Sequence, residues 1–117
     1  MYTISKQFNF SASHLIKGLP AEHPCTRLHG HNYVVELVLA SDQLDSIGFV
    51  VDYHELKRFK DIIDKELDHR HLNDVLPYPP TAEYIAYYLY QKAKKIWSLV
   101  VAVRVSETTK TWSEYRE

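Results

Sequence analysis

Three histidines near the start of the chain have the types and spacing that best fit chemistry. His29 and His31 flank one glycine, and residues two apart on an extended strand project to the same side. Imidazole nitrogens are good metal ligands, and His14 upstream supplies a third one. Three protein ligands leave one tetrahedral position open, which distinguishes a catalytic zinc from a closed structural one. The pattern predicts a zinc site with an open position.

Cys25 is the only cysteine and lies four residues before His29. As a fourth ligand it would close the metal site and make it structural, whereas as a thiolate beside the metal it would be a base or a nucleophile. Its spacing leaves both interpretations open. The metal is open too, because iron, nickel and copper accept imidazole as zinc does.

A second polar cluster follows Leu67. Asp68 precedes His69, and a carboxylate beside an imidazole can orient it for proton transfer. The same residues would also suit an ordinary loop, but with a metal site upstream we predict an acid–base pair. Glu107 follows an apolar run, where its carboxylate could accept two hydrogen bonds from a planar ligand edge or simply be solvated.

The elements that must position these residues follow from periodicity. Alternating apolar residues predict a strand over 2–14, and strand propensity resumes at His29 after a long connection. Asp52 has the form of an N-cap that opens a helix with apolar residues at Leu56, Phe59, Ile62, Ile63 and Leu67. Thr81 is the expected N-cap of a second helix.

Strands over 100–105 and 111–115 complete the order ββααββ. We therefore predict an α+β fold with an antiparallel four-stranded sheet and two helices on one face. Such a sheet keeps two open edges and a partly bare second face, so a homo-oligomer is expected.

Composition limits the alternatives. The chain has 117 residues, of which 45% are apolar, and we expect one domain over 1–117. Its 14 basic and 15 acidic residues form no block, so neither a nucleic-acid nor a membrane partner is expected. The start of the chain lacks the apolar core of a signal peptide, which favours a cytoplasmic protein.

Several segments occur together in a characteristic order. They are Phe10–His14, Cys25–His31, Phe49–Tyr53, Leu67–Asn73, Pro80–Glu83 and Val105–Thr108. In this combination the chain resembles the 6-pyruvoyltetrahydropterin synthase family, and especially its 6-carboxytetrahydropterin synthase branch.

The resemblance implies a tunnelling fold, in which subunits pool their sheets into an oligomeric barrel, usually a hexamer built from two trimers. It also implies active sites at subunit interfaces. The implied substrate is 7,8-dihydroneopterin triphosphate, and the branch would release acetaldehyde and triphosphate on a route toward queuosine.

The resemblance also implies roles for single residues. The three histidines would bind Zn²⁺, and Cys25 would be the proton-abstracting thiolate. Asp68 and His69 would form the partner acid–base pair, supplied by a neighbouring subunit. Glu107 would anchor the amino and ring N–H edge of the pterin, and Thr81 would lie against the same ring.

Two alternatives remain beside this interpretation. The pyruvoyl-forming branch shares the same machinery, whereas a folate-linked branch uses a glutamate around the position of Cys25. A different class would be a non-catalytic oligomer that binds zinc or a pterin, with Cys25 as a metal ligand.

Overall fold

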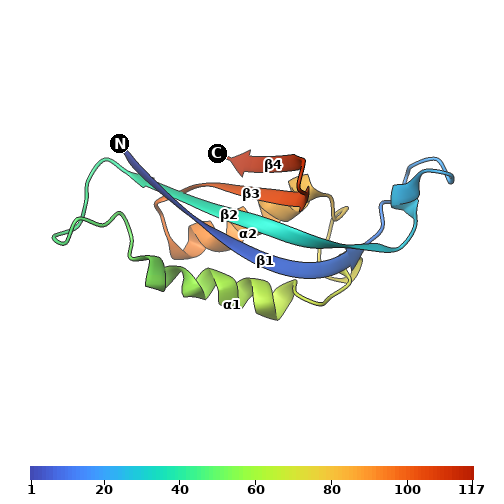
Figure 1. The fold of residues 1–117 in the computed structure, drawn as a ribbon, viewed down its shortest axis with the longest axis horizontal. Helices are drawn as coiled ribbons and strands as arrows, with labels where there is room; N and C mark the ends of the chain where they lie inside the picture. Colours follow the sequence, from blue (N-terminus) through green and yellow to red (C-terminus); the bar gives the residue numbers. More distant parts are fainter.

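Two long strands dominate the structure, a computed structural model that describes residues 1–117. β1 (Tyr2–His14) and β2 (His29–Ser41) pair antiparallel without interruption, from Tyr2 opposite Ser41 to His14 opposite His29 (Figure 1). Buried residues recur at every second position over most of both strands, so each turns one side toward the core. The two predicted strands are confirmed.

β3 (Val100–Thr108) and β4 (Thr111–Arg116) complete a sheet of order β1-β2-β3-β4, in which all neighbours are antiparallel. β3 is longer than the strand predicted over 100–105, because its hairpin with β4 continues the pairing to Thr108. Glu107 therefore lies within the strand, near its end.

The first helix begins later than its sequence signal suggests. Asp52 caps as predicted, since its Oδ1 accepts a hydrogen bond from the His54 N–H at 2.9 Å. The turn that it caps is η2 (Tyr53–Leu56), a 3₁₀ helix, and α1 (Lys57–Glu66) follows it. Short 3₁₀ turns are common at helix entries, and periodicity alone does not distinguish them from the helix itself.

The second helix, α2 (Ala82–Ile96), begins where predicted, with Thr81 Oγ1 accepting from the Tyr84 N–H at 3.2 Å. Both α-helices lie on the same side of the sheet (Figure 1), which confirms the α+β class and the order ββααββ. Two further 3₁₀ turns, η1 (Pro24–Thr26) and η3 (Leu72–Asp74), lie in the connections that carry the candidate site.

The core fills the space between the helices and one face of the sheet. It contains 23 buried residues, among which Tyr33, Phe59, Leu37 and Leu56 are large side chains with no exposure. Burying one such side chain stabilises a fold by roughly 1.5–3 kcal/mol, so this core holds the helices against the sheet. Neither helix is long and apolar enough to cross a membrane.

Candidate metal centre and active site

The three histidines meet at one end of the β1–β2 pair. His14 faces His29 across the ladder, and His31 follows on the same side of β2. Their rings pack edge to face with centroids 4.5 to 5.0 Å apart. One ligand atom from each lies within 4.8 Å of the others, which is the geometry of a group that could hold a metal ion.

Backbone carbonyls fix the tautomers of two of these rings. His14 Nδ1 lies 2.7 Å from the Pro80 carbonyl oxygen, and His29 Nδ1 lies 2.7 Å from that of Arg27. A carbonyl can only accept, so both Nδ1 atoms must carry the proton. The two Nε2 atoms then face each other at 2.9 Å, an arrangement that a metal ion bound by both, or a proton shared between them, would stabilise.

The environment of His31 is a second, independent indication of a metal site. Its Nε2 atom is buried and has no hydrogen-bond partner. The nearest carboxylate oxygen, Glu107 Oε2, lies 3.5 Å away, within ion-pair range only. A buried polar atom without a partner costs free energy unless a ligand occupies it. The donor set therefore fits a metal ion bound by three imidazole nitrogens.

Burial disfavours a proton as the cation. His14 is 1% exposed, and this burial lowers its pKa, opposed by its hydrogen bond to the Pro80 carbonyl. The neutral ring is the form that ligates a metal. The Tyr33 hydroxyl lies 3.3 Å from His14 Nδ1, and burial raises the pKa of that phenol, so it remains protonated.

Cys25 lies outside the histidine group. It is half-buried in η1, and the ligand atoms that lie within 4.8 Å of one another do not include its Sγ. Its N–H donates to His23 Nδ1 at 3.1 Å, and its carbonyl accepts from the Ile16 N–H at 2.7 Å. The geometry gives no support to a closed four-ligand site, and the role of Cys25 as a base stays a prediction.

Asp68 and His69 form the predicted contact. Asp68 Oδ2 lies 2.9 Å from His69 Nδ1, while Oδ1 accepts from the Ser11 N–H at 2.9 Å. The Ser11 hydrogen bond, with a further contribution from His69, lowers the pKa of Asp68. The carboxylate is thus fixed to β1 and available to orient the imidazole.

His69 is held in an uncommon backbone conformation. Its φ is 58°, the left-handed region that non-glycine residues seldom adopt, and its N–H donates to the Ser11 carbonyl at 2.6 Å. Its side chain is 81% exposed. Such backbone strain is often found at functional sites, and here it directs an imidazole outward from the chain.

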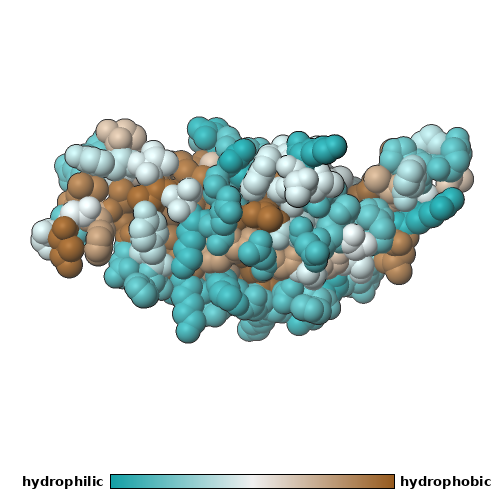
Figure 2. Space-filling model, viewed as in Figure 1, coloured by the Kyte–Doolittle hydropathy of each residue, from teal (hydrophilic) through white to brown (hydrophobic).

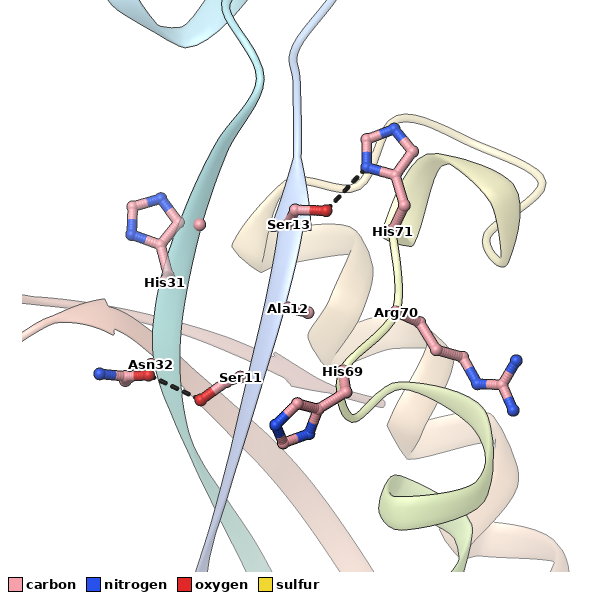
Figure 3. Close-up of a pocket in the computed structure, with 9 residues that line it drawn as sticks. Ser11, Ala12, Ser13, His31, Asn32, His69, Arg70 and His71 are labelled. Carbon is pink, nitrogen blue, oxygen red and sulfur yellow. Dashed lines mark hydrogen bonds between the residues drawn. The ribbon is translucent and has the colours of Figure 1, made fainter.

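A polar hollow of about 460 Å³ lies beside this pair. Figure 3 shows Ser11 and Ser13 of β1 in the middle, His69 and His71 on one side with Arg70 pointing away, and His31 and Asn32 of β2 on the other side. Hydroxyl, imidazole and amide groups line the hollow, with one apolar residue among nine.

Glu107 lies close to the histidine group, whereas Thr81 is linked to it only through the preceding residue, Pro80. Glu107 contacts His31 as described, and Thr81 follows Pro80, whose carbonyl orients His14. The Thr81 hydroxyl already caps α2, so any contact with a ligand would be additional to that role.

The family model of 6-pyruvoyl tetrahydropterin synthase matches residues 3–117. The chain belongs to this family. A solved structure of Caenorhabditis elegans 6-pyruvoyl tetrahydropterin synthase superposes with a TM-score of 0.87 at 26% identity, covering 99% of this chain and 95% of that one.

Curated relatives in the family have two different names. The 6-carboxy-5,6,7,8-tetrahydropterin synthase of Synechocystis is 37% identical over 81% of this chain and 77% of its own, and that of Bacillus subtilis is 31% identical over 98% and 85%. The dihydroneopterin monophosphate aldolase of Pyrococcus furiosus is 36% identical over 74% and 70%.

In this 6-pyruvoyl tetrahydropterin synthase family member, the predicted catalytic groups are held by different parts of the chain. Asp68 and His69 are bonded to Ser11, whereas Cys25 is bonded to Ile16. Five residues of extended chain span on the order of 15 Å. The structure thus places Glu107 beside His31, and it holds the acid–base pair at Ser11 and Cys25 at Ile16.

Sequence reasoning missed the residues that support the site. Tyr33 could have been found, because it continues the alternation of His29 and His31 on the same face. His23, to which sequence analysis assigns no role, caps the turn that carries Cys25. The Pro80 carbonyl is different, since a backbone group brought in by tertiary folding has no sequence signal.

Proposed function

We propose that this protein is a zinc-dependent lyase that converts 7,8-dihydroneopterin triphosphate, with uptake of water, to 6-carboxy-5,6,7,8-tetrahydropterin, acetaldehyde and triphosphate. The observation that carries the proposal is the three-histidine cluster in a chain whose full-length relatives include 6-carboxy-5,6,7,8-tetrahydropterin synthases. In this role it would supply a pterin for queuosine biosynthesis.

His14, His29 and His31 would hold the zinc. When bound, zinc supplies Lewis-acid polarisation of a substrate hydroxyl and carbonyl, which makes neighbouring protons easier to remove. Pro80 and Arg27 keep the Nε2 atoms of His14 and His29 deprotonated and directed inward. Such carbonyl contacts to ligating imidazoles fix ring orientation and raise ligand basicity.

Two groups would move protons. The Cys25 thiolate would remove a proton from the substrate side chain, and His69 would exchange a proton at a second side-chain carbon. Asp68 accepts from Ser11 and contacts His69 Nδ1, so it would hold the imidazole with Nε2 free to react. The substrate bond that is aligned with these groups is the one that would be cleaved.

Glu107 and Thr81 would select the pterin. A carboxylate can accept two parallel hydrogen bonds from adjacent N–H groups, which is what the amino and ring N–H edge of a pterin offers. Glu107 lies 3.5 Å from His31, so a ring held there would place its side chain beside the metal.

Two other reactions of the same site are supported by specific relatives. The Caenorhabditis structure supports a 6-pyruvoyltetrahydropterin synthase, which eliminates triphosphate without breaking the carbon chain. The Pyrococcus relative supports an aldolase that acts on dihydroneopterin monophosphate. A non-catalytic pterin-binding oligomer is the alternative from another class.

Product analysis separates these possibilities. The zinc-loaded protein is incubated with dihydroneopterin triphosphate and, separately, with the monophosphate, and the products are identified by mass spectrometry. We expect acetaldehyde and 6-carboxytetrahydropterin from the triphosphate. Formation of 6-pyruvoyltetrahydropterin would select the pyruvoyl branch, cleavage of the monophosphate alone would select the aldolase, and no turnover of either would favour the binding protein.

A further inference from the structure

Residues 68–73, which follow α1, form a series of hydrogen bonds with the end of β1. Ser11 bonds Asp68 and His69, and the Ser13 N–H donates to the Arg70 carbonyl at 3.1 Å. Ser13 Oγ also lies 3.0 Å from His71 Nδ1 (Figure 3). The segment thus runs beside β1 as a short parallel extension of the sheet.

Asn73 makes the last of these contacts, with both ends of its amide. The Leu15 N–H donates to Asn73 Oδ1 at 3.0 Å, and Asn73 Nδ2 donates to the Leu15 carbonyl at 3.0 Å. One side chain thereby satisfies both main-chain groups of a residue just beyond the end of β1. A primary amide offers a donor and an acceptor on adjacent atoms, whereas an ionised carboxylate of the same length offers acceptors only.

Leu15 directly follows His14, so the consequence concerns the histidine group. The residues on both sides of His14, Ser13 and Leu15, donate backbone hydrogen bonds to residues 70–73. The His14 ring is bonded to Pro80, further along the same connection. The position of this imidazole is therefore set by residues 70–80 and not by the hairpin alone.

We propose that Asn73 is a positioning residue that holds His14 in place for the metal ion and keeps it in fixed relation to the Asp68–His69 pair. The inference rests on the metal site of the proposed function. Loss of the amide frees the Leu15 backbone, which lets His14 move relative to His29. Removing groups that orient metal ligands typically weakens metal affinity by about 10-fold to 100-fold.

The test measures metal binding, not only turnover. Co²⁺ affinity is determined by equilibrium dialysis, and the visible spectrum of the bound ion is recorded for the wild type, Asn73→Ala and Asn73→Asp. Asn73→Asp keeps the acceptor for the Leu15 N–H but sets a carboxylate against the Leu15 carbonyl, so it serves as the second variant if alanine prevents folding. Both variants should bind Co²⁺ about 10-fold or more weakly, with an altered spectrum.

Two controls separate positioning from stability. Asn9→Ala removes an exposed amide of β1 that makes no hydrogen bond, and Leu89→Ala destabilises the α2 packing away from the site. Both should bind Co²⁺ as the wild type does, even though Leu89→Ala lowers the unfolding temperature.

The inference is overturned if Asn73→Ala binds Co²⁺ within about twofold of the wild type, or if Leu89→Ala weakens binding as much. A wild type that does not bind Co²⁺ or Zn²⁺ would instead refute the metal site itself, and with it the role of Asn73. His69→Ala provides a contrast, because it should lower turnover while leaving Co²⁺ affinity unchanged.

Discussion

At the scale of single residues, main-chain carbonyls decide which imidazole nitrogens are available in the histidine cluster. Pro80 and Arg27 each accept from an Nδ1–H group, so His14 and His29 present unprotonated Nε2 atoms 2.9 Å apart. In water such a pair would separate or take up a proton. Here the ladder holds the rings together and burial opposes protonation of His14, so a bound metal ion would relieve the repulsion between the two lone pairs.

The number of ligands in the cluster predicts the effect of removing His29. His29→Ala should abolish stoichiometric zinc binding, because two remaining imidazoles do not form a site of useful affinity. Zinc content after dialysis, measured by atomic absorption, checks the prediction. His54→Ala, which changes an exposed histidine outside the cluster, is the matched control and should keep its zinc. A zinc-replete His29→Ala protein would show that the ligand set is wrong.

Substitution of Cys25 is predicted to lower the rate of turnover without weakening zinc binding. Its thiol lies outside the three-histidine group, so Cys25→Ala should retain zinc. Turnover should fall by about 10²-fold to 10⁴-fold, the usual contribution of a positioned acid–base group. Zinc content and initial rates are measured on the same preparation. Full turnover with zinc bound would exclude the thiolate as the base.

At the scale of elements, the connection between α1 and α2 (residues 67–81) carries two of the three proposed catalytic residues, Asp68 and His69. The Asp68 carboxylate accepts a hydrogen bond from Ser11 and so links the start of this connection to β1. The hydrogen bond from Ser11 holds the pKa of Asp68 below its ordinary value of 3.8. A depressed carboxyl pKa stabilises the fold above that value, and the contribution is lost as the pH falls through the folded-state pKa.

Asp68→Asn should therefore be less stable than the wild type at neutral pH, with a difference that shrinks toward zero as the pH falls below about 3.8. Urea unfolding curves between about pH 7 and about pH 2.5 measure this difference. Asp61→Asn changes an exposed carboxylate of α1 without a hydrogen-bond partner and should show no such trend. A difference that is independent of pH would mean that the Asp68 carboxylate is not the stabilising group.

The second part of the connection ends at the Thr81 cap, which serves α2. Thr81→Ala should lower the free energy of unfolding by about 1 kcal/mol, whereas Thr81→Ser retains the hydroxyl that accepts from Tyr84 and should cost much less. Chemical denaturation compares the two variants. If the hydroxyl also contacts the pterin, Thr81→Ala will raise KM and Thr81→Ser will not. Equal stability of the two variants would refute the capping role.

Local patterns predicted these elements well, and the contacts between them poorly. Alternation and caps place His14, His29 and Thr81 correctly, because each depends on neighbours close in sequence. The contacts of Asn73 and Pro80 join residues far apart in the chain, with partners 58 and 66 positions apart. Such contacts depend on how the connection folds over β1, which periodicity does not describe.

At the scale of the whole molecule, much of the surface is suited to association. The chain measures 56 × 25 × 24 Å, with a free edge on β4, an edge of β1 that pairs only near Ser11–Ser13 with residues 69–71, and no helix on the second face of the sheet. Apolar side chains gather at the end near the N-terminus (Figure 2), where Met1 is 81% and Ile47 is 76% exposed. Unpaired edges and exposed apolar patches are commonly buried in oligomers, which agrees with the homo-oligomer expected from the sequence.

Mixing two inactive variants tests whether that assembly completes the active site. Cys25→Ala and His69→Ala proteins are unfolded together, refolded at equal concentrations and assayed. If the active sites lie at subunit interfaces, as the family resemblance implies, each site would combine Cys25 of one subunit with the exposed His69 of another. Random assembly then restores both groups in about a quarter of the sites, so activity should recover to about a quarter of the wild-type value. Each variant refolded alone supplies the baseline. If Cys25 and His69 act within one subunit, every site keeps one defect and the mixture stays as inactive as its parents.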